Sequence, residues 1–426
     1  MTTTPTQEVT TSSVAADLQD ERLLQAHGVG GRFRAELARI RTGDLGSLPV
    51  AVGLIVIWIV FQSLNSNFLS PNNLVNLLLQ SAAVGTISVG IVLVLLLGEI
   101  DLSVGSVSGV AAAILAVGFV NKGWPLGLAI LLAILAGTVI GLFYGVLYTR
   151  FGVPSFVITL AGLLGFLGLQ LWVLGKEGSI NIDFNSWIVR FCQQMFVSPA
   201  VSYGIVVVVA LVYAGAALQR RRQRGAAGLS TASIAEIVVR AALLAVVLGV
   251  VVWYLNSGEG RQQGRGVGYM VVLFVAIVVV MNLVLRRSRW GRSVYAVGGN
   301  VEAARRAGIS VNRVYVTVFA LCSTFAAVGG VLAAGRLASA NQASGGADTN
   351  LNAIAAAVIG GTSLFGGRGS AYSALLGILV IQSIASGLAL LSLDSSVRYM
   401  ITGAVLLIAV IIDSISRRSR QSAGRA

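Results

Sequence analysis

A series of long apolar segments is the feature that most constrains what this sequence can fold into. There are twelve of them, and most are long enough for a helix to cross a bilayer, which takes roughly 20 residues. They lie near residues 50–66, 74–97, 103–120, 125–149, 155–174, 201–218, 236–255, 269–285, 313–334, 351–364, 371–391 and 398–412. Only 11% of the 426 residues are charged, compared with roughly 25% in soluble domains. The sequence therefore predicts an all-α integral membrane protein, a polytopic bundle of about 10–12 transmembrane helices.

One of these segments, residues 351–364, is shorter than the others and rich in glycine. Non-helical backbone at membrane depth is tolerated only where protein or water surrounds it. We therefore expect a broken or re-entrant segment here. Five glycines fall between residues 360 and 369, and close helix packing through small residues is the simplest interpretation of them.

The polar ends of the chain set the expected boundaries. Residues 1–48 are predicted to form a polar tail, residues 49–415 the transmembrane domain, and residues 416–426 a basic tail. Between residues 33 and 40 of the first tail, apolar side chains recur at helical spacing among arginines. This pattern is typical of an amphipathic helix on an anionic membrane surface, and a merely solvated charged helix is the alternative.

The arginines indicate the orientation, because loops rich in basic residues stay in the cytoplasm. If all twelve segments cross, every basic run falls on one side of the membrane. The runs are Arg220–Arg222, Arg286–Arg287, Arg305–Arg306 and Arg417–Arg418. Both termini are therefore expected in the cytoplasm. Because the basic residues cluster at the ends of apolar runs, the net charge of +14 indicates membrane anchoring and not nucleic-acid binding.

Two acidic residues occur in the apolar sequence "LLLGEIDLSVGS", residues 95 to 106. A carboxylate at membrane depth normally faces protein or water, so Glu99 and Asp101 indicate a break between two helices. One interpretation is a break that lines a transport pathway. The other is structural: Asp101, followed by Ser103, caps the next helix and satisfies its free N–H groups.

A second polar feature is the loop at residues 292–313. Asn300 is a good helix N-cap, Glu302 lies in the first turn, where the helix dipole favours an acid, and Gly308 suits the C-cap. Arg305 and Arg306 complete a short helix outside the membrane. Such a short helix is marginal in water and needs a surface to dock on. An ordinary basic cytoplasmic loop is the alternative.

Signals for catalysis and cofactors are weak. The single histidine, His27, lies in the polar tail, and Cys192 and Cys322 form no metal or disulfide pattern. Around Gly175 and Lys176 the requirements of a phosphate-binding loop are not met, because Gln170 replaces the first glycine and Glu177 replaces the Ser/Thr. We expect no enzyme activity, no metal and no cofactor.

Four ordered segments resemble a known family. They are "GEIDLSVGSVSG", "GVPSFVITLAGLLGFLGLQ", "GRSVYAVGGNVEAARRAGI" and "NLNAIAAAVIGGTSLFGGRGSAYSALLGIL", and they resemble permease subunits of bacterial ABC importers for monosaccharides, of the ribose, galactose and xylose type. The resemblance runs from about residue 50 to 415. The extra apolar segments within 200–265 resemble the longer xylose-type permeases, which makes a pentose such as xylose the expected substrate.

The resemblance implies partners and a location. A permease of this family lies in the bacterial inner membrane as a dimer, with two ATPase domains that hydrolyse ATP and an extracytoplasmic sugar-binding protein. Asn300 to Gly308 would be the coupling helix, inserted in a groove of the ATPase. Glu302, Arg305 and Arg306 would be its polar contacts.

A neutral sugar needs hydroxyl, amide and aromatic partners along its path. Besides the helix break, we expect contributions from Gln170, Trp172, Asn341 and Gln342. The main rival is a secondary transporter driven by protons or sodium, for which an intramembrane Asp101 would be natural. The common facilitator pattern places a basic loop between its second and third helices, whereas "GEIDLSVGS" contains no basic residue.

Overall fold

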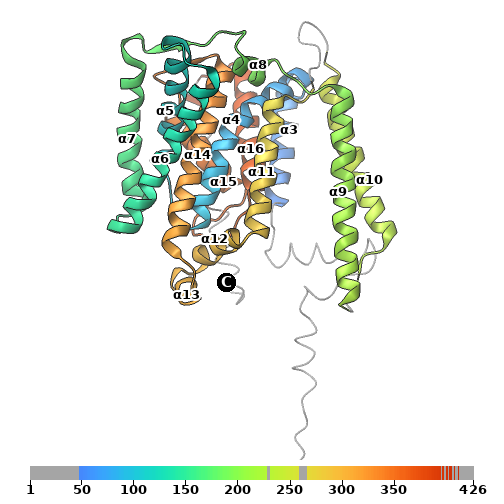
Figure 1. Ribbon diagram of the computed structural model, residues 1–426. Coiled ribbons are helices and arrows are strands. Elements are labelled where there is room, and N and C mark those ends of the chain that lie inside the picture. Colours follow the sequence, from blue (N-terminus) through green and yellow to red (C-terminus); the bar gives the residue numbers. More distant parts are fainter. Residues whose placement is uncertain are drawn as a thin grey trace, which may run out of the picture. The chain divides into compact units, whose positions relative to one another are not determined.

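The computed structural model describes residues 48–227, 231–258 and 266–394, with scattered positions between 396 and 411 (Figure 1). The predicted surface helix of the N-terminal tail, the C-terminal tail and most of the last apolar segment lie outside the described residues. The described part is largely helical. Its α-helices are α3 (Leu48–Leu64), α4 (Pro71–Leu96), α5 (Val104–Ala116), α6 (Leu126–Phe151), α7 (Ser155–Leu174), α8 (Trp187–Gln193), α9 (Pro199–Ala226), α10 (Ile234–Asn256), α11 (Tyr269–Arg287), α12 (Arg289–Gly299), α13 (Val301–Arg306), α14 (Val311–Leu337), α15 (Ala347–Ile359) and α16 (Tyr372–Leu390).

Three short elements complete the described structure. A π-helical turn, η1 (Val117–Asn121), extends α5, and a 3₁₀ turn, η2 (Gly175–Glu177), follows α7. The strands β1 (Ser179–Asn181) and β2 (Ser339–Asn341) pair antiparallel, with Ile180 opposite Ala340.

Nine helices of the described residues are long and apolar enough to cross a membrane. They are α4, α5 with η1, α6, α7 with η2, α9, α10, α11, α14 and α16. The apolar part of α3, Pro49–Leu64, is somewhat shorter. The predicted all-α polytopic membrane protein is confirmed.

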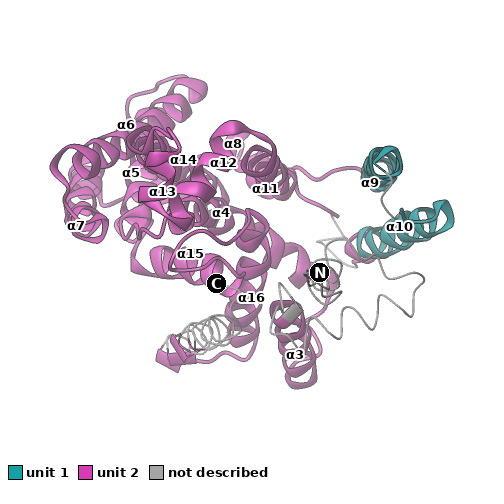
Figure 2. Ribbon diagram, turned by 90° about the horizontal axis from the view of Figure 1, so that it is seen from below, with its two compact units in different colours: residues 1–45, 199–253 teal, residues 46–198, 254–426 magenta. Residues whose placement is uncertain are grey.

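The chain divides into two compact units (Figure 2). The smaller consists of residues 1–45 and 199–253, and its described helices are α9 and nearly all of α10. The larger consists of residues 46–198 and 254–426 and contains the other helices. Every feature discussed below as a candidate site lies in the larger unit.

The core of the larger unit forms around α4 and α14, which are buried along most of their length. One face of α6 carries Gly137, Gly141 and Gly145, spaced one helical turn apart, and this face lies against α14. A Cβ on Gly145 would stand only 2.6 Å from the Cα of Val316. Small residues thus let the two backbones approach closely, as expected between membrane helices.

Helix α4 has clear local start and stop signals. The Ser70 hydroxyl accepts a hydrogen bond from the N–H of Asn73 at 3.4 Å, and Pro71 occupies the first helical position. After α4, Gly98 has a φ of +79°, which a glycine adopts at little cost. The chain therefore leaves the helix sharply at the break predicted around Glu99 and Asp101.

Helix α15 forms from the short segment that the sequence predicts to be broken or re-entrant. Its 13 residues extend about 20 Å, less than the thickness of the hydrocarbon core. The non-helical residues 342–346 precede it and lie against α5, where a Cβ on Gly109 would stand 2.5 Å from the carbonyl oxygen of Ser344. This irregular backbone packs on α5 on one side, while Gln342 and Ala343 are exposed on the other.

Candidate functional site

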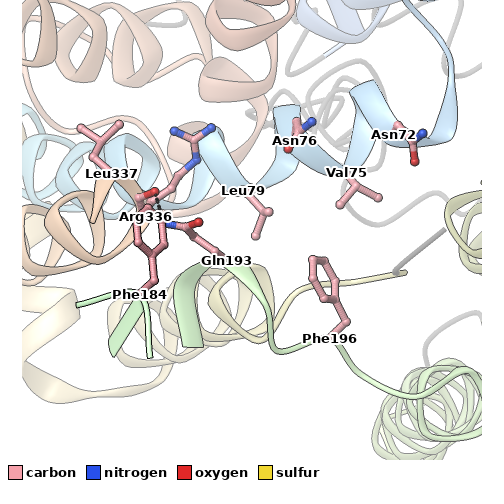
Figure 3. Close-up of a pocket in the computed structure, with 9 residues that line it drawn as sticks. All are labelled: Asn72, Val75, Asn76, Leu79, Phe184, Gln193, Phe196, Arg336 and Leu337. Carbon is pink, nitrogen blue, oxygen red and sulfur yellow. Dashed lines mark hydrogen bonds between the residues drawn. The ribbon is translucent and has the colours of Figure 1, made fainter. Parts of the chain in front are cut away.

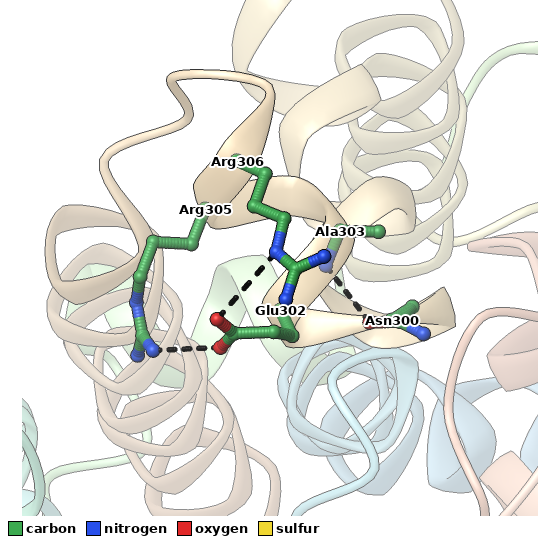
Figure 4. A network of polar contacts seen from close by, with 5 residues as sticks. All are labelled: Asn300, Glu302, Ala303, Arg305 and Arg306. Atoms are coloured by element: carbon green, nitrogen blue, oxygen red, sulfur yellow. Dashed lines mark hydrogen bonds and ion pairs between the residues drawn. The ribbon is translucent and has the colours of Figure 1, made fainter.

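The loop between α11 and α14 consists of the two short helices α12 and α13 (Figure 4). Asn300 separates them, and its Oδ1 accepts a hydrogen bond from the N–H of Ala303 at 2.9 Å. At the other end of α13, Gly308 has a φ of +80°, and its N–H donates to the carbonyl of Arg305. The helix caps expected from the sequence are therefore present.

The outer face of α13 carries its charges. Glu302 Oε2 contacts Arg305 Nη1 at 2.9 Å, and Glu302 Oε1 lies 3.9 Å from Arg306 Nε. All three side chains are more than half exposed, whereas Ala304 is buried. Exposed ion pairs within a helix contribute little to stability, so these groups are available to a partner surface.

Three segments of backbone meet beside this loop, and we call their contact the glycine junction. It consists of Leu96, the last residue of α4, with Gly98 just after it, Gly298 at the end of α12, and Gly366 and Gly367 in the turn after α15. The N–H of Gly367 donates to the carbonyl of Leu96 at 2.9 Å. A Cβ on Gly298 would overlap that same carbonyl oxygen, and a Cβ on Gly366 would stand 2.7 Å from the carbonyl oxygen of Gly298. Only glycine at position 298 permits this approach.

A side-chain hydrogen bond joins α12 to the same turn. The Tyr295 hydroxyl donates to the carbonyl of Gly369 at 2.9 Å. Burial raises the pKa of the Tyr295 phenol, and Arg286 opposes this only in part, so the hydroxyl remains a protonated donor at neutral pH. The loop helices are therefore connected to the end of α4 and to the turn after α15.

The break between α4 and α5 buries Asp101 completely. Its Oδ1 accepts hydrogen bonds from the N–H of Ser103 at 2.8 Å and from the Ser103 hydroxyl at 2.7 Å. The Cys322 thiol of α14 lies 3.7 Å from the other carboxylate oxygen. The carboxylate therefore has a structural contact with Ser103, the residue before α5, but it does not bond to the free N–H groups of the first turn of α5, as the expected cap would.

Glu99 connects the break to two neighbouring helices. It accepts hydrogen bonds from the Tyr148 hydroxyl of α6 at 2.6 Å and from the Ser155 hydroxyl of α7 at 2.5 Å. The next residues are also held, since the carbonyl of Leu102 accepts a bond from the Asn350 amide of α15 at 2.6 Å. Both acids of the break therefore accept hydrogen bonds from neighbouring groups.

The remaining predicted path residues fall into two groups. Gln170 is fully buried, and its Nε2 donates to the carbonyls of Asn341 at 3.0 Å and Ser344 at 2.8 Å. Gln342 lies against Gly178 in the same region. Trp172, by contrast, is 79% exposed. The structure brings Gln170, Asn341 and Gln342 together around the turn before α15 and leaves Trp172 outside this cluster.

A cavity of about 430 Å³ lies beside α8, at the end of the bundle opposite the α12–α13 loop (Figure 1). Figure 3 shows the residues that line it. Its polar lining residues are Asn72, Asn76, Gln193 and Arg336. None of these four residues was expected at a site from the sequence. Arg336 could have been noticed in the sequence, because it is a basic residue at the otherwise non-basic end of its apolar segment.

Comparison with known proteins identifies the family. A family model described as the permease component of a branched-chain amino acid transport system matches residues 73–410. The chain belongs to this permease family. No solved structure matches the permease.

Curated relatives of the permease align over most of its length. It is 34% identical to the xylose transport system permease protein XylH of Escherichia coli K12, over 87% of this chain and 90% of the relative. The xylose transport system permease protein XylH of Haemophilus influenzae is 32% identical, over 89% of this chain and 99% of the length of the relative. The ribose import permease protein RbsC of Bacillus subtilis is 31% identical, over 90% of this chain and 97% of the length of the relative.

Proposed function

We propose that the permease is the membrane subunit of an ATP-driven importer of a monosaccharide, with a pentose such as xylose as the first substrate to test. The observation that carries this proposal is the similarity, over 87% of the chain, to a permease named for xylose transport. ATP hydrolysis belongs to a separate ATPase subunit, and an extracytoplasmic binding protein delivers the sugar. Two copies of the permease form the path.

The α12–α13 loop is the proposed docking site for the ATPase. Arginines gather at this end of the bundle, at the end of α11 and in α12 and α13. By the positive-inside rule this end faces the cytoplasm, and both termini lie on the same side. The exposed charges of Glu302, Arg305 and Arg306 then face the ATPase surface.

The glycine junction supplies the mechanical connection. When the ATPase subunits close on nucleotide, they displace α13 and with it α12. Because Gly298 touches the carbonyl of Leu96 without intervening side chains, α12 cannot shift without moving the end of α4. The displacement reaches the α4–α5 break, which is hydrogen-bonded to α6, α7 and α15, so the helices move together as a bundle.

A proton- or sodium-driven transporter is not favoured. Such a transporter needs an acidic group that binds the coupling ion and releases it. Both acids of the break are instead occupied by hydrogen bonds from neighbouring hydroxyl and amide groups. The motifs described above resemble ABC importers, and the relatives are named as permease proteins of a xylose transport system and of ribose import.

Reconstitution in liposomes tests the proposal. The permease is combined with its ATPase and sugar-binding protein, and uptake of labelled D-xylose and ATP hydrolysis are measured together. We expect uptake only when all components and ATP are present. Accumulation of sugar by the permease alone, driven by a proton or sodium gradient, would contradict the proposal.

A double variant tests the docking surface. Glu302→Gln with Arg306→Gln removes an exposed pair, so the bundle should fold while sugar uptake falls relative to ATP hydrolysis. The control is Glu236→Gln with Arg240→Gln, which removes an i,i+4 pair from α10, a helix outside the proposed docking surface. Normal uptake by the double variant would show that α13 is not the docking site.

A further inference from the structure

The cavity at the end opposite the α12–α13 loop combines amides, aromatic rings and one guanidinium. Asn72 and Asn76 come from the first turns of α4, Phe184 and Gln193 from the segment around α8, Phe196 from the following loop and Arg336 from the end of α14 (Figure 3). Its volume of about 430 Å³ lies within the range of small-molecule sites.

The tertiary structure holds this lining in place. Gln193 Nε2 donates to the carbonyls of Arg336 at 2.7 Å and Gly335 at 3.3 Å. Segments from opposite halves of the chain are thus joined at the cavity wall. Because only the Nε2 of Gln193 is used in these bonds, its Oε1 remains an acceptor for a ligand. Figure 3 shows the Phe196 ring directed toward Val75 and Leu79 of α4.

The polar groups suit a neutral polyhydroxylated ligand. A hydroxyl group both donates and accepts hydrogen bonds, and a side-chain amide offers both functions, whereas an anion only accepts. The three side-chain amides each carry a carbonyl oxygen that accepts hydrogen bonds. An anionic group has no hydrogen to donate to these oxygens, whereas a sugar hydroxyl does. The aromatic rings of Phe184 and Phe196 provide apolar faces for the C–H groups of a sugar ring.

A second cavity adjoins the first. It has a volume of about 560 Å³, shares Phe184 and Leu337 with the first and is further lined by Asn181 and Asp183. The two cavities meet at the end of α14, which is the end away from α13. If α13 faces the cytoplasm, as proposed above, both cavities are on the side from which an importer receives its substrate.

We propose that the cavity lined by Asn72, Asn76, Phe184, Gln193, Phe196 and Arg336 is an outer binding site for a neutral monosaccharide on its way through the permease. This inference rests on the proposed function for the direction of transport. It adds a defined site and assigns its residues to sugar contacts.

Cysteine protection tests whether a sugar occupies the cavity. Asn76 is exposed, so Asn76→Cys should fold and react with a membrane-impermeant maleimide in right-side-out vesicles that contain the permease and its ATPase. The native Cys192 and Cys322 are fully buried and contribute little background. The control is Asn67→Cys, an exposed position at the same end that does not line the cavity.

The probes are D-xylose, D-xylonate and L-leucine, each titrated into the high millimolar range. We expect D-xylose to slow labelling of Asn76→Cys about tenfold at about ten times its dissociation constant, without changing Asn67→Cys. Protection by D-xylonate alone would mean an anion site and would overturn the inference. Protection by L-leucine alone would overturn it as well.

A second pair of variants tests the same site by transport. Asn76→Phe fills the cavity and should lower D-xylose uptake by the full importer about tenfold or more, whereas Asn67→Phe should transport normally. Co-purification with the ATPase checks that both variants fold. D-xylose could be imported without protecting Asn76→Cys and without any loss of uptake in Asn76→Phe. In that case the cavity is not the sugar site, while the proposed function stands. If no sugar is imported by the unmodified importer, the proposed function itself fails.

Discussion

The backbone N–H of Gly367 donates to the carbonyl oxygen of Leu96 at 2.9 Å. Leu96 is the last residue of α4, and Gly367 belongs to the turn between α15 and α16. Gly298 of α12 packs on that same carbonyl. Helices that are distant in the sequence therefore meet at one peptide group, next to the exposed loop that we propose as the ATPase docking site.

The glycine junction should not tolerate a methyl group. Gly298→Ala places a Cβ on the Leu96 carbonyl oxygen, so α12 must separate from α4. We expect sugar uptake to be lost, with much less effect on ATP hydrolysis. The control is Gly299→Ala, because a Cβ on Gly299 has open space within 4 Å. Equal uptake by the two variants would contradict the proposed connection.

The cap of α13 should matter for docking more than for folding. Asn300→Ala removes the acceptor of the Ala303 N–H and should destabilise the short helix by about 1 kcal/mol. Hydrogen exchange of the amides in α13 should become faster, and coupled ATP hydrolysis should fall. Asn300→Asp keeps an acceptor at the same position and should restore both measurements. Unchanged exchange in Asn300→Ala would show that the cap is not needed.

Asp101 should behave as a structural acceptor for Ser103. Asn retains an acceptor for the Ser103 N–H and hydroxyl, so Asp101→Asn should transport sugar with an unchanged dependence on pH. Asp101→Ala leaves these buried donors without a partner and should lower the stability of the bundle by about 1–3 kcal/mol. Sugar uptake is measured across a range of pH, and the stability of both variants is measured by unfolding. Together these measurements distinguish a structural role of Asp101 from a role in proton coupling. A shifted pH profile in Asp101→Asn would favour the proton-coupled rival.

Gln170 and Trp172 should respond very differently to the same change. Gln170→Leu removes the side-chain donor of the Ser344 carbonyl and one of the two donors of the Asn341 carbonyl, which should cost about 1–3 kcal/mol of stability. Trp172→Leu changes an exposed side chain on the same helix and should cost little. Thermal unfolding in detergent measures both. A loss of stability in Trp172→Leu comparable to that of Gln170→Leu would contradict this assignment.

The sequence predicts those features that depend on neighbouring residues. Apolar runs of about 20 residues are helical in a bilayer because every backbone group must find its partner within the segment. Capping is equally local, so Asn300 and Gly308 could be assigned from spacing alone. A structural role for Asp101 beside Ser103 could be predicted for the same reason, because the two residues are neighbours in the sequence. A transport pathway, by contrast, needs walls from distant segments.

Tertiary structure alone decided the rest. Gln170 and Trp172 are two residues apart in sequence, yet one is buried and pairs with the turn before α15 while the other is 79% exposed. Nothing local distinguishes them, because an almost uniformly apolar membrane helix does not reveal which face meets protein and which meets lipid. The glycine junction and the outer cavity likewise combine segments from both halves of the chain. Their existence depends on backbone contacts and packing between distant helices, which hydropathy and spacing along one segment do not encode.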